Sequence, residues 1–311
     1  MRHIIGISIG GTKTAICYAT LGDNNEVLEV VKKQTPTLPF DPDTNMKNIY
    51  KAIDEYPQDF DFISVIAGSP MDADNGLILA PSNLRGWHDY PIVNLLKERY
   101  KVDSTLLNDA DASALAEYIY GVGKGSRNFV YLTVGTGFGA GLILNGQLYS
   151  GGCFNAGEIG HLRGSETANG PTRNEKKGSF ESLVSGGGMG DYANAFIKDH
   201  PNSLLNKYEK ISARDVFTEA RNGDEFALFI VNQCATKLGE ALSIILDLLN
   251  PDVVAIGGIY PRGLDLLEKT VLKVAEENSL PINFHHAKIL PSELEEKIDD
   301  YSSLMGIFKN K

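Results

Sequence analysis

The sequence is poor in cysteine and in positive charge. Its three cysteines, Cys17, Cys153 and Cys234, lie far apart and lack the spacing of a disulfide framework, so we expect reduced thiols. The 29 Lys and Arg residues are outnumbered by 40 Asp and Glu residues, which gives a formal net charge of -11. A nucleic-acid surface needs clustered basic side chains, so we expect no nucleic-acid partner, although a nucleotide site needs only a few donors.

Long apolar segments are also scarce. The N-terminus carries one arginine and then a strand interrupted by glycines, which does not fit a secretory signal. No apolar run approaches the roughly 20 residues that span a bilayer. We therefore expect a cytoplasmic protein without a membrane partner, and its 311 residues, 42% of them hydrophobic, suffice for two domains with substantial cores.

Strands and helices alternate along much of the chain, as α/β folds require. The opening strand covers residues 4–9, and the stretch "NFVYLTVGTGFGAGLILNGQL" later repeats its order of strand, glycine and threonine turn, strand and hairpin. Two such copies, far apart in the chain, predict a duplicated architecture with a cleft between its halves. We also expect helices over residues 43–56 and in "PIVNLLKERY", and a long apolar helix in "EFALFIVNQCATKLGEALSIILDLL".

Two glycine turns are typical of phosphate sites. In "GISIGGTKT", Gly10 and Gly11 let the backbone bend sharply and bring N–H groups close to an anion. Ser8 precedes this turn, an unusual residue for managing a metal ion, since hard cations prefer carboxylates. The second turn, "GTGFGAG", also fits a dinucleotide motif with Glu158 about 20 residues on, but a strand rather than a helix follows it, which excludes that interpretation.

Several polar residues are candidates for acid–base or binding roles. Asn108 and Asp109 follow an apolar strand, where either can simply cap a helix, but where the Asp109 carboxylate could also accept a proton from a hydroxyl. In "NAGEIGHL", Glu158 and His161 stand three residues apart, close enough to converge, beside glycines that leave room for a ligand. Taken alone, Glu181 in "GSFES" reads as a surface carboxylate.

Together these stretches resemble the ROK family of sugar kinases and repressors, within the actin-like ATPase fold. The motifs "GISIGGTKT", "GWHDYPI", "NDADASALAE", "GTGFGAG", "AGEIGH" and "VVAIGG" match that family in order across nearly the whole chain. The resemblance implies a two-lobed α/β fold, ribonuclease H-like, with duplicated mixed sheets and an interlobe cleft. It places residues 1–106 and 294–311 in a small lobe and residues 107–293 in a large one.

The resemblance also implies a function and a site. The activity is the ATP- and Mg²⁺-dependent phosphorylation of a hexose or N-acylated hexosamine at its 6-hydroxyl, with Asp109 as the general base, in a protein that is commonly a homodimer. The implied sugar-binding residues are Gly68, Asn83, Asn108, Asp109, Glu158, His161 and Glu181. The implied ATP-binding residues are Gly10, Gly11, Thr12, Lys13, Gly135, Thr136, Gly137, Gly257 and Gly258.

The sequence departs from the family at two places. Many relatives carry a C-x-C-G-x-x-G-C-x-E stretch that joins a histidine in binding zinc, whereas Thr172, Asn174 and Ser179 stand at the cysteine places here, so we expect no zinc. At the second place, Ser8 stands where the family has the aspartate that orders the magnesium ion and its waters. Asp109 favours an active kinase, while Ser8 supports the alternative of a catalytically weak or inactive sugar-binding or sensor protein. A repressor would carry an N-terminal helix-turn-helix domain, for which we expect no room.

Overall fold

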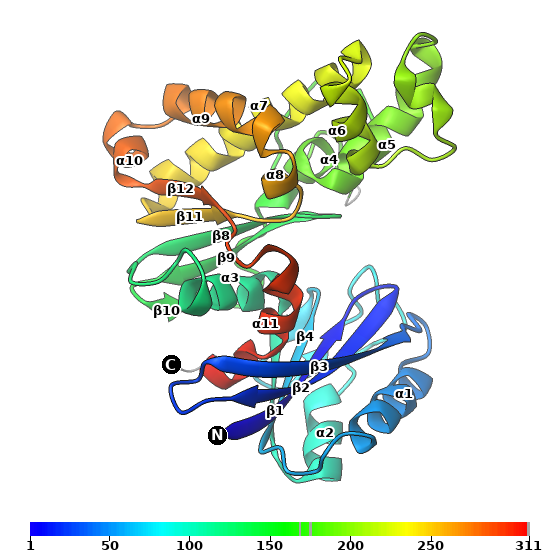
Figure 1. Ribbon diagram of the computed structural model, residues 1–311, viewed down its shortest axis with the longest axis vertical. Coiled ribbons are helices and arrows are strands. Elements are labelled where there is room, and N and C mark those ends of the chain that lie inside the picture. Colours follow the sequence, from blue (N-terminus) through cyan, green and yellow to red (C-terminus); the bar gives the residue numbers. More distant parts are fainter. Residues whose placement is uncertain (168, 174–175, 310–311) are drawn as a thin grey trace. The chain divides into compact units, whose positions relative to one another are not determined.

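The computed structural model describes residues 1–167, 169–173 and 176–309, which form two compact units (Figure 1). The first unit comprises Met1–Ile119, Gln147–Ala156 and Glu296–Lys311, and the second comprises Tyr120–Gly146 and Gly157–Glu295. The predicted lobes, residues 1–106 with 294–311 and residues 107–293, stay a prediction. Residues 107–119 belong to the first unit, together with the strand that precedes their helix.

A five-stranded mixed sheet forms the centre of the first unit, in the order β3-β2-β1-β4-β7. β1 pairs antiparallel with β2 and parallel with β4, and β4 pairs parallel with β7. The strands are β1 (Arg2–Ile9), β2 (Lys13–Leu21), β3 (Val27–Pro36), β4 (Phe62–Ala67) and β7 (Asp103–Asn108). The helices are α1 (Pro42–Asp54), α2 (Ile92–Tyr100), α3 (Asp109–Tyr120) and α11 (Ile298–Ser303), and the short strands are β5 (Met71–Asp72), β6 (Leu77–Ile78) and β10 (Gln147–Leu148).

Alternation along β1 separates the two faces of this sheet. Ile5 and Ile7 belong to the core that includes the apolar residues of α1 and α2. Gly6 and Ser8 point to the opposite face because successive side chains of a strand alternate. A Cβ placed on Gly6 would lie 2.5 Å from the Ser303 Oγ of α11. Ser8 therefore shares its face of the sheet with α11.

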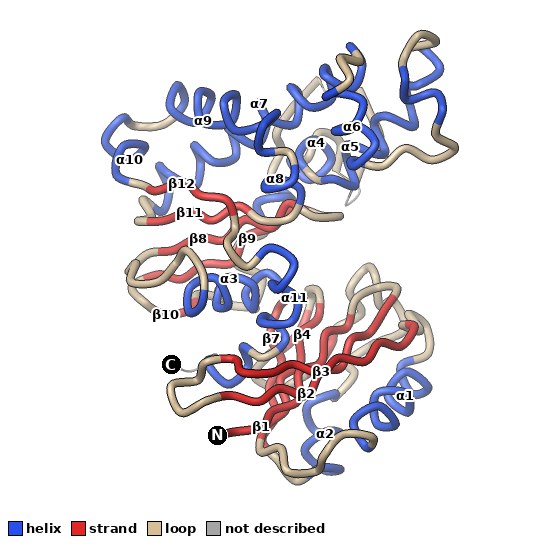
Figure 2. The backbone as a smooth tube through the Cα atoms, in the orientation of Figure 1, coloured by secondary structure: helices blue, strands red, loops and turns tan. Residues whose placement is uncertain are grey.

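The second unit repeats this topology, and the predicted α/β fold with duplicated mixed sheets is confirmed (Figure 2). β8 pairs antiparallel with β9 and parallel with β11, and β11 pairs parallel with β12, in the same order as β2-β1-β4-β7. The strands are β8 (Phe129–Val134), β9 (Phe138–Leu144), β11 (Val253–Ile256) and β12 (Lys288–Pro291). β9 ends at the predicted Asn145–Gly146 turn, where both residues have positive φ, as Asn-Gly hairpins favour.

Helices make up most of the rest of the second unit. They are α4 (Phe180–Val184), α5 (Gly186–Phe196), α6 (Ala213–Arg221), α7 (Glu225–Leu249), α8 (Ile259–Arg262), α9 (Leu264–Asn278) and α10 (Pro281–His286). By length and composition α7 could cross a membrane. The prediction that no apolar segment is long enough to span a bilayer is therefore wrong for this helix. However, 56% of its most apolar window is buried, and it packs against α9, α6 and α4, as a core helix does.

Candidate functional site

The carboxyl ends of β1, β4 and β7 meet at one edge of the first sheet. Ile9 stands in register with Ala67, and Ala67 with Asn108. The residues that follow these positions are the predicted phosphate turn, Gly68 and Asp109. Parallel α/β sheets bind ligands at this edge. The first unit thus brings together predicted residues that lie far apart in the sequence.

Asn83 lies against two of these segments. A Cβ placed on Gly11 would lie 2.9 Å from the Asn83 Cβ, and one placed on Gly68 would lie 3.6 Å from the Asn83 Oδ1. The turn itself closes through the Gly10 N–H, which donates to the Lys13 carbonyl over 3.1 Å. Because Asn83 packs so closely on Gly11, a larger residue at position 11 would displace it.

Asn108, rather than Asp109, caps helix α3. The Asn108 Oδ1 accepts hydrogen bonds from the backbone N–H groups of Ala110 (2.8 Å) and Asp111 (3.2 Å), and its Nδ2 donates to the Ser69 Oγ (2.8 Å). Asp109 is the first residue of α3 and is exposed, with its Oδ1 accepting from the Ala110 N–H over 2.8 Å. The ordinary capping role thus falls mainly to Asn108, and the Asp109 carboxylate stands at the surface of the unit.

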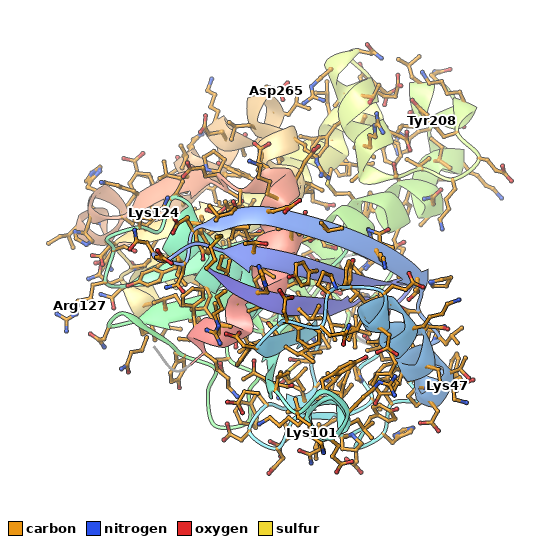
Figure 3. The ribbon with its side chains drawn as sticks, turned by 60° about the horizontal axis from the view of Figure 1, so that its bottom comes forward. Lys47, Lys101, Lys124, Arg127, Tyr208 and Asp265 are labelled. Carbon is orange, nitrogen blue, oxygen red and sulfur yellow. The ribbon has the colours of Figure 1, made fainter. Side chains whose placement is uncertain are left out.

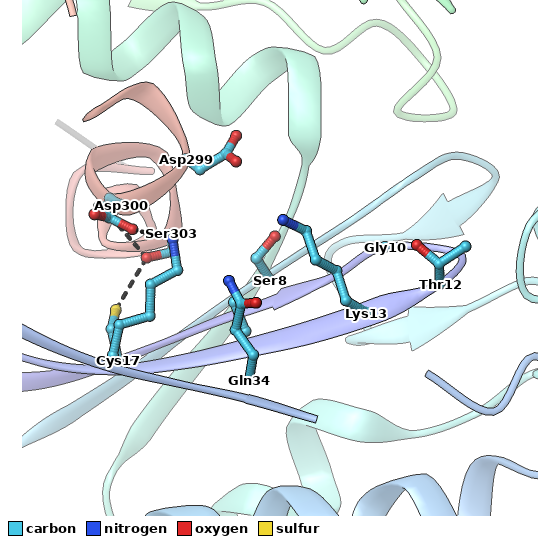
Figure 4. Close-up of a pocket in the computed structure, with 11 residues that line it drawn as sticks. Ser8, Gly10, Thr12, Lys13, Cys17, Gln34, Asp299, Asp300 and Ser303 are labelled. Carbon is cyan, nitrogen blue, oxygen red and sulfur yellow. Dashed lines mark hydrogen bonds and ion pairs between the residues drawn. The ribbon is translucent and has the colours of Figure 1, made fainter. Parts of the chain in front are cut away.

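A pocket of about 220 Å³ lies beside the phosphate turn (Figure 4). Ser8, Lys13 and Asp299 line it, and within the described residues neither the Lys13 ammonium nor the Asp299 carboxylate has a hydrogen bond or an ion pair. The neighbouring Asp300 differs, because it forms an ion pair with Lys32. The pocket therefore offers a cation, a hydroxyl and a carboxylate to a ligand.

In the second unit, the turn Gly135–Gly137 lies against Gly258, and the neighbouring Gly257 N–H donates to the Leu132 carbonyl over 2.9 Å. The Gly135 N–H donates to the Gly137 carbonyl over 3.0 Å. Gly258 has φ of 73°, and a Cβ on it would lie 2.1 Å from the Val134 carbonyl oxygen and 3.0 Å from the Gly135 nitrogen. Only glycine fits such a backbone at this distance. Two segments that are predicted to bind ATP, the turn Gly135–Gly137 and the segment with Gly258, are therefore in contact.

Glu158, His161 and Glu181 also gather in the second unit. The His161 Nε2 lies 3.7 Å from the Glu158 Oε2, and the Glu181 Oε2 accepts from the Phe138 N–H over 3.1 Å. Burial raises the pKa of the Glu158 carboxyl, His161 opposes this, and the Glu181 charge adds to it. The hydrogen bond to Phe138 ties Glu181 to the residue that follows the glycine turn.

Of the three positions where the resemblance places zinc cysteines, Ser179 has a capping role. It caps helix α4, its Oγ accepting from the Ser182 N–H over 3.3 Å. Thr172 is exposed, and Asn174 lies outside the described residues. Across residues 1–167, 169–173 and 176–309 no group of three or more His, Cys, Asp and Glu side chains is placed to hold a metal ion.

Sequence reasoning missed Arg173, which contacts the second glycine turn. The Arg173 Nη1 donates to the Thr136 carbonyl over 2.9 Å, and its Nε pairs with Asp191 over 2.8 Å. One feature of the sequence could have drawn attention to Arg173: it lies between Thr172 and Asn174, two of the positions where many relatives have cysteines. Nothing in the sequence indicates its contact with Thr136.

Comparison with known proteins gives consistent matches. The chain matches the ROK family over residues 4–308. It is 32% identical over 293 residues to a glucokinase of Halalkalibacterium halodurans, covering 90% of this chain and 87% of the relative. It is 28% identical over 277 residues to an N-acetylmannosamine kinase of Yersinia pestis, covering 89% of each. A solved ROK family glucokinase from Streptomyces griseus, in complex with glucose and AMPPNP, superposes with a TM-score of 0.73 over 97% of both chains at 24% identity, a likeness of fold.

Proposed function

The chain belongs to the ROK family, and on that premise we propose that it is a kinase that uses ATP to phosphorylate a hexose or N-acylated hexosamine at the 6-hydroxyl. One observation carries the proposal. The exposed Asp109 carboxylate follows β7 at the sheet edge where the turn Gly10–Lys13 follows β1. The similarity to proteins named glucokinase and N-acetylmannosamine kinase supports the sugar as the acceptor.

The proposed mechanism assigns the proton to Asp109. In-line phosphoryl transfer needs positioning and charge neutralisation more than covalent chemistry. The Asp109 carboxylate accepts the proton of the attacking hydroxyl, as a general base does. Asn108 positions it by fixing the first turn of α3. The Gly10–Lys13 turn binds phosphate oxygens, and the Lys13 ammonium neutralises part of their charge.

The donors beside this turn fit ATP with its magnesium ion. Mg²⁺ prefers oxygen ligands and keeps several waters, and Ser8 and Asp299 place a hydroxyl and a carboxylate in the pocket that Lys13 also lines. When bound, the ion neutralises phosphate charge during transfer. These residues therefore suit an ion held largely through its waters and through phosphate oxygens.

The proposed sugar ligands are side chains that form hydrogen bonds. In the first unit Asn83 and Asn108 offer amide groups, and in the second unit Glu158 and Glu181 offer carboxylate oxygens to hydroxyl groups. The His161 ring supplies a donor or an acceptor according to its tautomer. Gly68 lies beside the Asn83 amide, since a Cβ placed on it would be 3.6 Å from the Asn83 Oδ1.

A catalytically weak sugar-binding or sensor protein is the second candidate. Ser8 favours it, because a hydroxyl cannot supply the charge of the aspartate that the family carries at this position. The two candidates share the sugar site and differ in turnover.

A screen for ADP release separates these candidates. We expect Mg-ATP with about ten hexoses and N-acylhexosamines to give sugar-dependent ADP release for at least one acceptor. A coupled assay measures the rate, and reactions without sugar are the control. Binding of a sugar in calorimetry with no ADP release for any acceptor would favour the sensor.

We expect the purified protein to contain no stoichiometric zinc and to keep its sugar affinity in a chelator. The reason is that Thr172 and Ser179 replace thiolates, and a structural zinc site needs about four N or S ligands. Elemental analysis by mass spectrometry measures the metal content. One zinc per chain would contradict this expectation, as would a loss of sugar affinity in the chelator.

A further inference from the structure

We infer that Arg173 is a positioning residue that orients the turn Gly135–Gly137 toward the phosphates of ATP, an inference that rests on the proposed function. Within the described residues Arg173 donates three hydrogen bonds. Its Nη1 donates to the Thr136 carbonyl over 2.9 Å, its Nε to the Asp191 Oδ2 over 2.8 Å, and its backbone N–H to the Ser182 Oγ over 2.9 Å. Arg173 thereby links helices α4 and α5 to the turn.

The contact with Thr136 sets the direction of a peptide group. In a trans peptide the C=O and the next N–H point in opposite directions. Arg173 holds the Thr136 carbonyl, and the Gly186 N–H holds the Gly135 carbonyl over 2.8 Å. The N–H groups of Thr136 and Gly137 therefore point away from both contacts. Within the described residues neither N–H donates a hydrogen bond, so both are available to an anion.

A glycine in helix α5 makes room for this contact. A Cβ placed on Gly187 would lie 2.4 Å from the Arg173 guanidinium carbon and 2.5 Å from the Thr136 carbonyl oxygen. Any side chain at position 187 would therefore separate the guanidinium from the turn. Asp191 lies one helical turn further along α5, so the same helix provides both the space and the carboxylate.

Arg173 acts by holding the turn in position more than by adding positive charge. Its guanidinium forms an ion pair with Asp191, over 2.8 Å, so the pair together carries no net charge. The planar fork of arginine reaches the carboxylate and the carbonyl together, whereas the single ammonium of lysine is a point charge without that fixed geometry. We therefore expect Arg173→Lys to restore only part of what Arg173→Ala loses.

The test is the affinity for Mg-ATP, measured by calorimetry. We expect Arg173→Ala to weaken ATP binding about tenfold, since a charge-assisted hydrogen bond contributes about that much. Arg173→Lys should give an intermediate loss, and Gly187→Ala should weaken ATP binding although it removes no charge. The matched control is Arg221→Ala, because Arg221 also bonds a carboxylate, Asp265, and a backbone carbonyl, that of Arg262 (Figure 3 labels Asp265).

The outcomes separate the two proposals. Weaker ATP binding in Arg173→Ala, with an unfolding midpoint equal to that of Arg221→Ala, supports the inference. If wild type binds ATP and Arg173→Ala binds it as tightly as Arg221→Ala does, the role of Arg173 is wrong and the proposed function stands. If Arg173→Ala does not fold, the ATP affinity of Arg173→Lys is compared with that of Arg221→Ala instead. A weaker affinity supports the inference and an equal affinity contradicts it. If wild type itself does not bind Mg-ATP, both proposals are wrong.

Discussion

Replacing Asp109 with asparagine should lower turnover by about a hundredfold or more, because general-base catalysis contributes at least that much. The amide keeps the size of the side chain but cannot accept the proton of the attacking hydroxyl. Sugar binding should persist, since Asn108 and Asn83 remain. The coupled ADP-release assay measures turnover, and calorimetry measures sugar affinity.

Asp103→Asn is the matched control for this experiment. Asp103 stands at the opposite end of β7, and its side chain is 84% exposed. The control should leave turnover unchanged. Equal turnover in Asp109→Asn and wild type would remove Asp109 from the mechanism.

Replacing Ser8 with aspartate should lower the magnesium requirement and raise turnover by about tenfold to a few hundredfold, the effect of about one well-placed electrostatic interaction. The Ser8 hydroxyl can at best accept a hydrogen bond from a metal-bound water or donate one to a phosphate oxygen. The pocket beside it leaves room for a longer side chain that faces Lys13. Magnesium titrations of both forms at saturating ATP measure the effect.

Two further variants show whether the effect of Ser8→Asp comes from its negative charge. Ser8→Asn has the size of aspartate without its charge and should not reproduce the gain. Asp299→Asn tests whether α11 already supplies negative charge to the pocket, in which case it should raise the magnesium requirement. If Ser8→Asp changes neither the magnesium dependence nor turnover, the account of Ser8 as a replaced carboxylate is wrong and the serine is structural.

Much of the fold could be predicted because its signals are local. The apolar strand before each glycine turn, and the helical spacing of Ile92, Leu95 and Leu96, depend only on near neighbours. The family prediction from six ordered motifs is confirmed by the match over residues 4–308. Which segments form one compact unit could not be predicted, because that depends on contacts between residues far apart in the sequence.

The candidate site likewise has a part that could be predicted from the sequence and a part that could not. Glycine turns at strand ends are visible in the sequence, since glycine is needed where the backbone approaches a ligand or another backbone. Arg173 was missed because its function depends on Thr136 and Asp191, which only the fold brings to it. The sequence also left open whether Asn108 or Asp109 caps helix α3, since both residue types cap helices well.

The most direct test of the proposed function is to identify the phosphorylated product. Wild-type protein, Mg-[γ-¹⁸O]ATP and the best acceptor of the ADP-release screen should give a sugar that carries the labelled phosphate, detected by mass spectrometry. Phosphorus NMR should place this phosphate on the 6-hydroxyl, and Asp109→Asn should make the product at least about a hundredfold more slowly. A protein that binds its sugar but transfers no labelled phosphate to any acceptor would contradict the account, as would transfer to a different hydroxyl.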